Sequence, residues 1–124
     1  MISRIRSKGE EILREIGSRA ALKNEKIIYW KNWLQLYNFH PECKDDPYAW
    51  LTDVLALRSV DSGNYGVGSI ITDAEGEVVT LGHNLMYSPS FRSDLHAEMV
   101  ILNDFEEKKS ANYNFEELYA LYLS

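Results

Sequence analysis

Apolar side chains near the start of the chain recur at the spacing of one helix face. These positions are Ile12, Leu13, Ile16 and Ala20. Ser7-Lys8-Gly9-Glu10 precedes all four and matches a capping box, in which the serine oxygen and the glutamate each bind an otherwise unpaired amide. The pattern therefore predicts a first helix from about Lys8 to Leu22.

A second apolar stripe follows, and it is rich in aromatic residues. Its members are Ile27, Trp30, Leu34 and Tyr37, at i, i+3, i+7 and i+10, with Trp33 and Leu36 widening it. The stripe predicts a second helix, which Asn24 could cap. Packing against another helix explains the aromatic side chains most simply, and a base-stacking platform or a subunit interface are the two sharper interpretations.

The strongest helix start in the chain is Asp45-Asp46-Pro47, an acidic N-cap followed by proline at the first helical position. An amphipathic stripe continues from it as Trp50, Leu51, Val54, Leu55 and Arg58. This pattern predicts a third helix that ends at about Val60.

Two short β-branched runs, Val67–Thr72 and Glu77–Leu81, lie on either side of Asp73-Ala74-Glu75-Gly76. Turn residues between two such runs indicate a β-hairpin, in which Gly76 takes the positive φ. Gly82-His83-Asn84 then closes the second strand. These positions predict one antiparallel pair of strands after the third helix.

The remaining pattern predicts one helix and one more strand. Ser93 and Asp94 signal the helix start, and the expected buried side consists of Met99, Val100, Leu102 and Phe105. The run Tyr119–Ser124 indicates a third strand. An apolar strand at this place leaves a sheet edge that can pair further, so we expect that a segment is missing or that another chain supplies it.

Composition indicates one globular domain in a reducing compartment. The 124 residues are 45% hydrophobic and 26% charged, and no apolar run is long enough to cross a membrane. Cys43 is the only cysteine, which excludes an internal disulfide and makes the cytoplasm the default location. The net charge of −6 is uneven, because residues 1–40 carry eight basic against four acidic side chains. That basic segment could dock onto the acidic remainder or attract nucleic acid.

The chemistry-bearing stretch is His96-Ala97-Glu98 at the mouth of the predicted fourth helix. Residues two apart share no helix face, but side chains of a first turn lean toward the open N-terminal end and can converge there. An imidazole and a carboxylate at such a place can serve as a metal ligand and a proton carrier. A favourable first-turn acid is the simpler explanation of Glu98. His83 competes as a ligand, and we interpret it as a loop or outer histidine.

The order hairpin, Gly-His-Asn, loop, His-Ala-Glu on a helix, then strand resembles the zinc-dependent cytidine and deoxycytidylate deaminase superfamily. The resemblance covers roughly Asp46 to Ser124 and looks closest to the nucleobase, nucleoside and tRNA-adenosine deaminases. It implies an α/β fold, a three-layer cytidine-deaminase-like sandwich with a mixed sheet, incomplete in this chain. Residues 42–124 would be the N-terminal part of that domain, and residues 1–41 a helical extension.

The resemblance also implies roles for single residues and a reaction. His96 would be a Zn²⁺ ligand, Glu98 the proton shuttle, and Ala97 the donor of a backbone amide to the substrate. Asn84 would contact the substrate's sugar or base. The implied reaction is hydrolytic deamination of a nucleobase, nucleoside or nucleotide amine, with the small-molecule substrate as the first partner and RNA as a further one.

The chain departs from the family pattern in its cysteines. The Pro-Cys-x-x-Cys element is absent, and Cys43 lies far before His96, where the family has no ligand. We therefore expect half an active site, completed by a C-terminal segment with two cysteines or within a homo-oligomer. The alternative is a catalytically inactive binding or assembly module that kept the fold.

Overall fold

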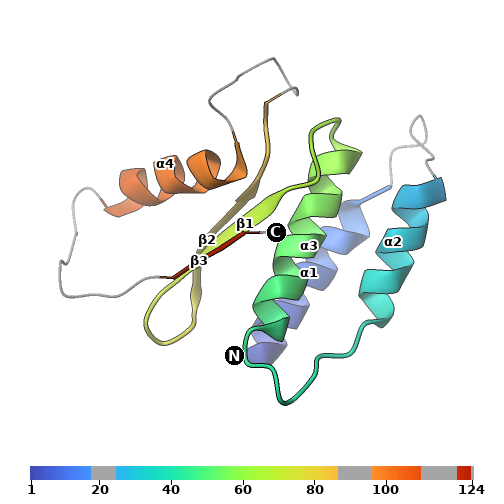
Figure 1. Ribbon diagram of the computed structural model, residues 1–124, viewed down its shortest axis with the longest axis horizontal. Helices are drawn as coiled ribbons and strands as arrows, with labels where there is room; N and C mark the ends of the chain where they lie inside the picture. Colours follow the sequence, from blue (N-terminus) through green and yellow to red (C-terminus); the bar gives the residue numbers. More distant parts are fainter. Residues whose placement is uncertain (18–24, 87–95, 110–119, 124) are drawn as a thin grey trace.

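The computed structural model describes residues 1–17, 25–86, 96–109 and 120–123, which form an α/β structure in three layers (Figure 1). A three-stranded sheet lies in the middle, α3 packs on one of its faces, and α4 covers the other. The helices α1 and α2 pack against α3 on the side away from α4. The α/β class predicted from the sequence is confirmed.

The described elements follow the predicted order. They are α1 (Ile2–Glu15), α2 (Glu25–Leu36), α3 (Asp46–Asp61), β1 (Gly68–Thr72), β2 (Val78–His83), α4 (Ala97–Lys109) and β3 (Ala120–Leu123). The sheet order is β2-β1-β3, and both pairings are antiparallel. The expected mixed sheet is therefore not found among the described strands, because each neighbour of β1 runs opposite to it.

The first helix begins earlier than the capping box predicts. It starts at Ile2 and continues through Ser7, so Ser7-Lys8-Gly9-Glu10 is helix interior and not a cap. The reason is tertiary packing, because Ile5 and Gly9 extend the buried face of the helix by two turns toward the N-terminus. Gly9 lies directly against the Trp50 ring, where a Cβ would have no room. The expected end at Leu22 and the Asn24 cap lie outside the described residues.

An arginine and a tryptophan join the three helices of this layer. The Trp50 indole nitrogen of α3 donates to the Leu34 carbonyl of α2 over 2.9 Å. The Arg6 guanidinium of α1 lies 4.5 Å from the centre of the Trp50 ring and donates to the carbonyls of Gln35 and Tyr37. Arg6 thus binds the last turn of α2, where helix carbonyls have no partner within the helix.

Strand β1 is buried along its whole length because helices cover both faces of the sheet. Its Gly68 backbone lies against the backbone of α3, and Gly82 of β2 lies against the side chains of Ile101 and Val100 of α4. The hairpin turn has Gly76 at φ +83°, as predicted. The two glycines at Gly68 and Gly82 therefore set how closely each helix approaches the sheet.

The buried side of α4 differs from the predicted one. Ala97 and Ile101 are fully buried, whereas Met99 is exposed. The stripe is displaced because α4 also buries polar contacts: the Ser69 hydroxyl donates to the Ala97 carbonyl over 2.9 Å, and the Thr80 hydroxyl binds the Asp104 carboxylate. The side of α4 that faces the sheet is therefore partly polar, so the spacing of apolar residues alone does not identify it.

Strand β3 confirms the predicted third strand; it pairs with β1 and is bound to the helical layer by one aromatic contact. The Tyr122 ring stacks on Tyr48 of α3 at 4.9 Å between ring centres, and its hydroxyl donates to Asp45. Leu121 and Leu123, on the opposite face, are half-exposed. None of the described helices is long and apolar enough to span a bilayer.

Substitution Gly68→Ala is expected to destabilise the protein by about 1–3 kcal/mol. The new Cβ would lie 2.6 Å from Leu55 Cβ and 2.8 Å from the Ala56 nitrogen, and helix backbone cannot move aside locally. Urea unfolding measures the change. Gly66→Ala is the matched control, because its Cβ would meet only a Val60 methyl group at 3.0 Å and a carbonyl at an ordinary distance. Equal losses in both variants would contradict the close-approach argument.

Candidate active site at the start of helix α4

His96 and Glu98 lie at the N-terminal mouth of α4, as the sequence predicts. His96 is the residue before the helix, and its carbonyl accepts the first helical hydrogen bond, from the Val100 amide over 2.9 Å. The His96 residue is exposed, and Glu98 in the first turn is half-buried. The amides of this first turn have no acceptor within the helix, so the mouth favours negative charge. The predicted start signals Ser93 and Asp94 lie outside the described residues.

Ala97, between the two, connects the helix mouth to the sheet. Its side chain is fully buried, and its carbonyl accepts the hydrogen bond from the buried Ser69 hydroxyl of β1. A carbonyl in the first turn of a helix normally points along the helix, so this contact binds β1 without removing an amide from the mouth. The backbone position of His96-Ala97-Glu98 is therefore determined by a strand residue.

Asn84 follows β2 and is almost completely buried. Its amide continues the strand pairing by donating to the Val67 carbonyl, and its own carbonyl accepts from the Ser59 hydroxyl. The side-chain oxygen of Asn84 accepts from the Met86 amide over 3.0 Å. These bonds orient the side chain so that its NH₂ group is the part left to bind a ligand.

Strand alternation places Asn84 on the same face of the sheet as α4. Gly82, two residues earlier, pairs with Ser69, and both contact α4. Side chains two positions apart point to the same face, so Asn84 and the Ala97 turn share one face and one end of the sheet. Figure 1 shows the end of β2 beside the start of α4.

The same alternation directs His83 to the other face. It pairs with Gly68, whose backbone touches α3. Burial lowers the pKa of His83, and the charge of Arg58 on α3 acts in the same direction, against the opposing contact of its Nδ1 with the Asn84 carbonyl. His83 is therefore a neutral imidazole of the α3 side at neutral pH and does not converge with His96.

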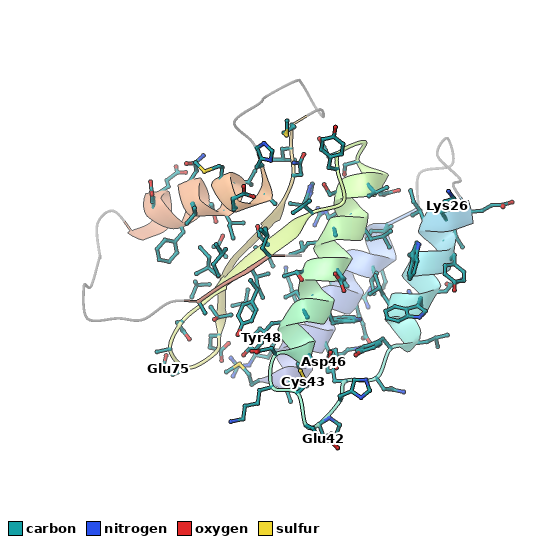
Figure 2. All side chains as sticks on the ribbon, in the orientation of Figure 1. Lys26, Glu42, Cys43, Asp46, Tyr48 and Glu75 are labelled. Atoms are coloured by element: carbon teal, nitrogen blue, oxygen red, sulfur yellow. The ribbon has the colours of Figure 1, made fainter. Side chains whose placement is uncertain are left out.

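The resemblance assigns one zinc ligand to this chain, His96, and the structure describes that residue. Among the described residues, no group of three His, Cys, Asp or Glu side chains could hold a metal ion. Cys43 lies in the α2–α3 connection at the opposite end of the helical layer from the start of α4 (Figure 2). Cys43 therefore does not lie beside His96 in this structure.

Sequence reasoning missed Ser69, which holds the helix mouth against the sheet. A serine in the middle of the apolar run Val67–Thr72 is the signal that could have identified it, because a buried hydroxyl needs a partner. The missed contact of Thr80 with Asp104 has the same kind of signal. Both hydrogen bonds hold α4 against the sheet, and neither lies at the open N-terminal end of the helix.

No protein-family model matches this chain, and no curated protein matches it at a significant level. The resemblance to the deaminases therefore depends on the residues quoted above. The geometry adds that Asn84 and His96-Ala97-Glu98 lie at one end of one face of the sheet.

The free energy of unfolding is expected to fall between about pH 7 and pH 5 because of His83. Its pKa in the folded protein is below the ordinary 6.5, so the unfolded chain binds the extra proton first as the pH drops. The contribution of neutral His83 to the free energy of unfolding is fully present above the pKa that this histidine has in the unfolded chain. It is lost as the pH falls toward the lower pKa of His83 in the folded protein.

Urea unfolding of His83→Gln across this range checks the assignment, because glutamine cannot take up the proton. The variant should show a flatter pH dependence than the parent. A parent slope unchanged by His83→Gln would contradict the burial argument.

Proposed function

We propose that this chain carries part of the active site of a hydrolytic deaminase acting on a nucleobase, nucleoside or nucleotide amine. The observation that supports it most is the placement of His96, Ala97 and Glu98 at a helix mouth that shares a sheet face and end with buried Asn84. In a deaminase reaction, water adds to the ring carbon that bears the amine, and ammonia leaves. That chemistry needs a proton carrier and a rigid binding edge at one place.

Glu98 is the proposed proton carrier. As a half-buried carboxylate at the open end of α4, it can take a proton from the attacking water and deliver it to a ring nitrogen and the departing amine. The free amides of the first turn, including that of Ala97, stabilise negative charge that develops on the substrate. The NH₂ group of Asn84 donates to a ring or sugar oxygen, because its carbonyl oxygen is already bound by Met86.

His96 is the proposed zinc ligand contributed by this chain. Zinc in such a site supplies a bound water whose pKa is lowered toward neutrality. Catalytic zinc sites use three protein ligands, and the described residues provide one, so the remaining donors have to come from outside them. We propose two cysteines on a complementing segment or on a neighbouring chain of a homo-oligomer.

The finer fold assignment, a three-layer deaminase-like sandwich, belongs to the same proposal. Strands β2 and β3 point in one direction because both are antiparallel to β1. A further strand that adds to the outer edge of β3 in that same direction would make the sheet mixed. Such a strand would also lie beside Leu121 and Leu123 and cover part of their side chains, which are half-exposed.

A second candidate is an inactive binding or assembly module with this fold. Two observations favour it: the described residues contain no group of three potential metal ligands, and several aromatic side chains of α2 are exposed. RNA as a partner receives less support, because Arg6 of the basic segment binds α2 carbonyls and Arg4 binds Glu77.

Zinc content separates a complete from an incomplete site. The purified 124-residue chain should hold close to no zinc after gel filtration, because one imidazole without thiolates binds the ion weakly. Elemental analysis against protein concentration measures this. Tight stoichiometric zinc on the chain alone would mean that the ligand set proposed here is wrong.

Glu98→Gln should lower the rate of ammonia release about 10²–10⁴-fold in the longest product of the gene, because glutamine cannot carry the proton. A screen across free bases, nucleosides and nucleotides with zinc present identifies the substrate. Glu106→Gln, at an exposed position further along the same helix, should keep the parent's rate. Absence of ammonia release from every substrate, with zinc bound, favours the inactive module.

A further inference from the structure

The helical layer contains a second candidate site, far from the start of α4. A groove of about 330 Å³ runs between α2 and α3. Its lining residues are Trp30, Trp33, Leu34, Asp53, Ala56, Leu57, Val60 and Gly66. The Trp30 and Trp33 rings, 5.9 Å apart at 70°, form a corner that is about half exposed to solvent. A contiguous exposed apolar surface beside polar residues is a common feature of interaction sites.

The acidic member of this groove is Asp53. Among the residues that the structure describes, its carboxylate has no hydrogen bond or ion pair, although Asp46, two turns earlier on α3, binds the Tyr37 hydroxyl and the His40 amide. Asp53 is exposed to solvent, but the apolar residues beside its carboxylate bury it in part, and this burial raises its pKa. Asp53 also lines a smaller hollow of about 80 Å³ that contacts Trp33 and Trp50.

The chain itself contains one arginine side chain, Arg6, that packs on aromatic rings. Trp50 lines the smaller hollow together with Trp33. The Arg6 guanidinium lies over Trp50 and Phe39, at 4.5 and 5.3 Å from the ring centres. Arginine suits both parts of a site of this kind, because its planar guanidinium stacks on aromatic faces and pairs with carboxylates. The groove at Trp33 offers a comparable aromatic wall and a carboxylate.

We propose that the α2–α3 groove binds an arginine side chain of a partner protein, stacked on Trp30 and Trp33 and paired with Asp53. The groove volume lies at the lower end of the range for ligand sites, about 300–1,000 Å³, which fits one long side chain with its flanking apolar contacts. No lysine or arginine lines the groove among the described residues, so the charge of the groove is complementary to a cationic side chain. This proposal does not depend on the deaminase assignment.

Two other occupants fit the groove less well. A nucleic acid would bring phosphates to a groove with a carboxylate and no basic lining residue. A second copy of this chain, related by a twofold axis through the groove, would bring two Asp53 carboxylates to one poorly hydrated interface. An arginine-bearing partner neutralises the carboxylate and covers the rings together.

The test is a tryptophan-fluorescence titration of the 124-residue chain with a blocked peptide of alternating leucine and arginine. The same peptide with citrulline in place of arginine is isosteric and uncharged. We expect saturable binding of the arginine peptide and about fivefold to tenfold weaker binding of the citrulline peptide. Asp53→Asn should reduce the affinity for the arginine peptide by a similar factor, and it should fold, because it removes a partly desolvated charge.

Glu75→Gln is the matched control, because it removes the same charge at the hairpin, far from α2 (Figure 2). Its affinity should equal the parent's. Equal binding of both peptides, or equal losses in Asp53→Asn and Glu75→Gln, would overturn the proposal in favour of apolar or non-specific electrostatic attraction. Self-association that Asp53→Asn strengthens would assign the groove to a second copy, and tighter binding of an RNA oligonucleotide than of the arginine peptide would assign it to nucleic acid.

Discussion

The close approach of two helices to the two faces of one strand pair determines the arrangement of this protein. At Gly68 the backbone of α3 approaches β1, and at Gly82 the side chains of α4 approach β2. Neither approach leaves room for a Cβ. Because β1 is thereby buried on both faces, its polar residue Ser69 has to find its partner inside, and it finds the Ala97 carbonyl. A packing constraint of the sheet thus places the first turn of α4, and with it His96 and Glu98.

The three-helix layer depends on a different kind of contact. Arg6 and Trp50 form one unit in which a guanidinium covers an indole and both groups donate to carbonyls near the end of α2. Such a junction is directional, since it fixes the ends of helices and not only their faces. The basic character of the N-terminal segment therefore serves partly to assemble the fold, and its charge is less available to an external anion than the composition indicates.

The sequence predicted the elements well because their period and turn chemistry are local. Asp46-Pro47 and Gly76 act within a few residues, and the structure has a helix start and a hairpin turn at these places. The predicted acidic cap is not formed, because Asp45 makes no side-chain hydrogen bond to the helix amides and accepts one from Tyr122. The start of α1 was predicted wrongly because a local capping motif at Ser7 competed with packing of Ile5 and Gly9 against distant residues. The buried side of α4 was mistaken for a similar reason, since its contacts with Ser69 and Thr80 depend on strand register.

For the candidate site, the sequence predicted which residues carry the chemistry and that His96 and Glu98 lie at the start of a helix. It could not predict which side chains of β2 and its end point toward that helix. Strand alternation and pairing show that Asn84 shares a face with α4 and that His83 does not, and neither follows from their adjacency in the chain. The distinction matters chemically, because two neighbouring residues end in different environments: Asn84 beside the open helix mouth, His83 desolvated near Arg58. In a strand, two neighbouring side chains point to opposite faces of the sheet, so His83 does not share the site of Asn84 although it adjoins it in sequence.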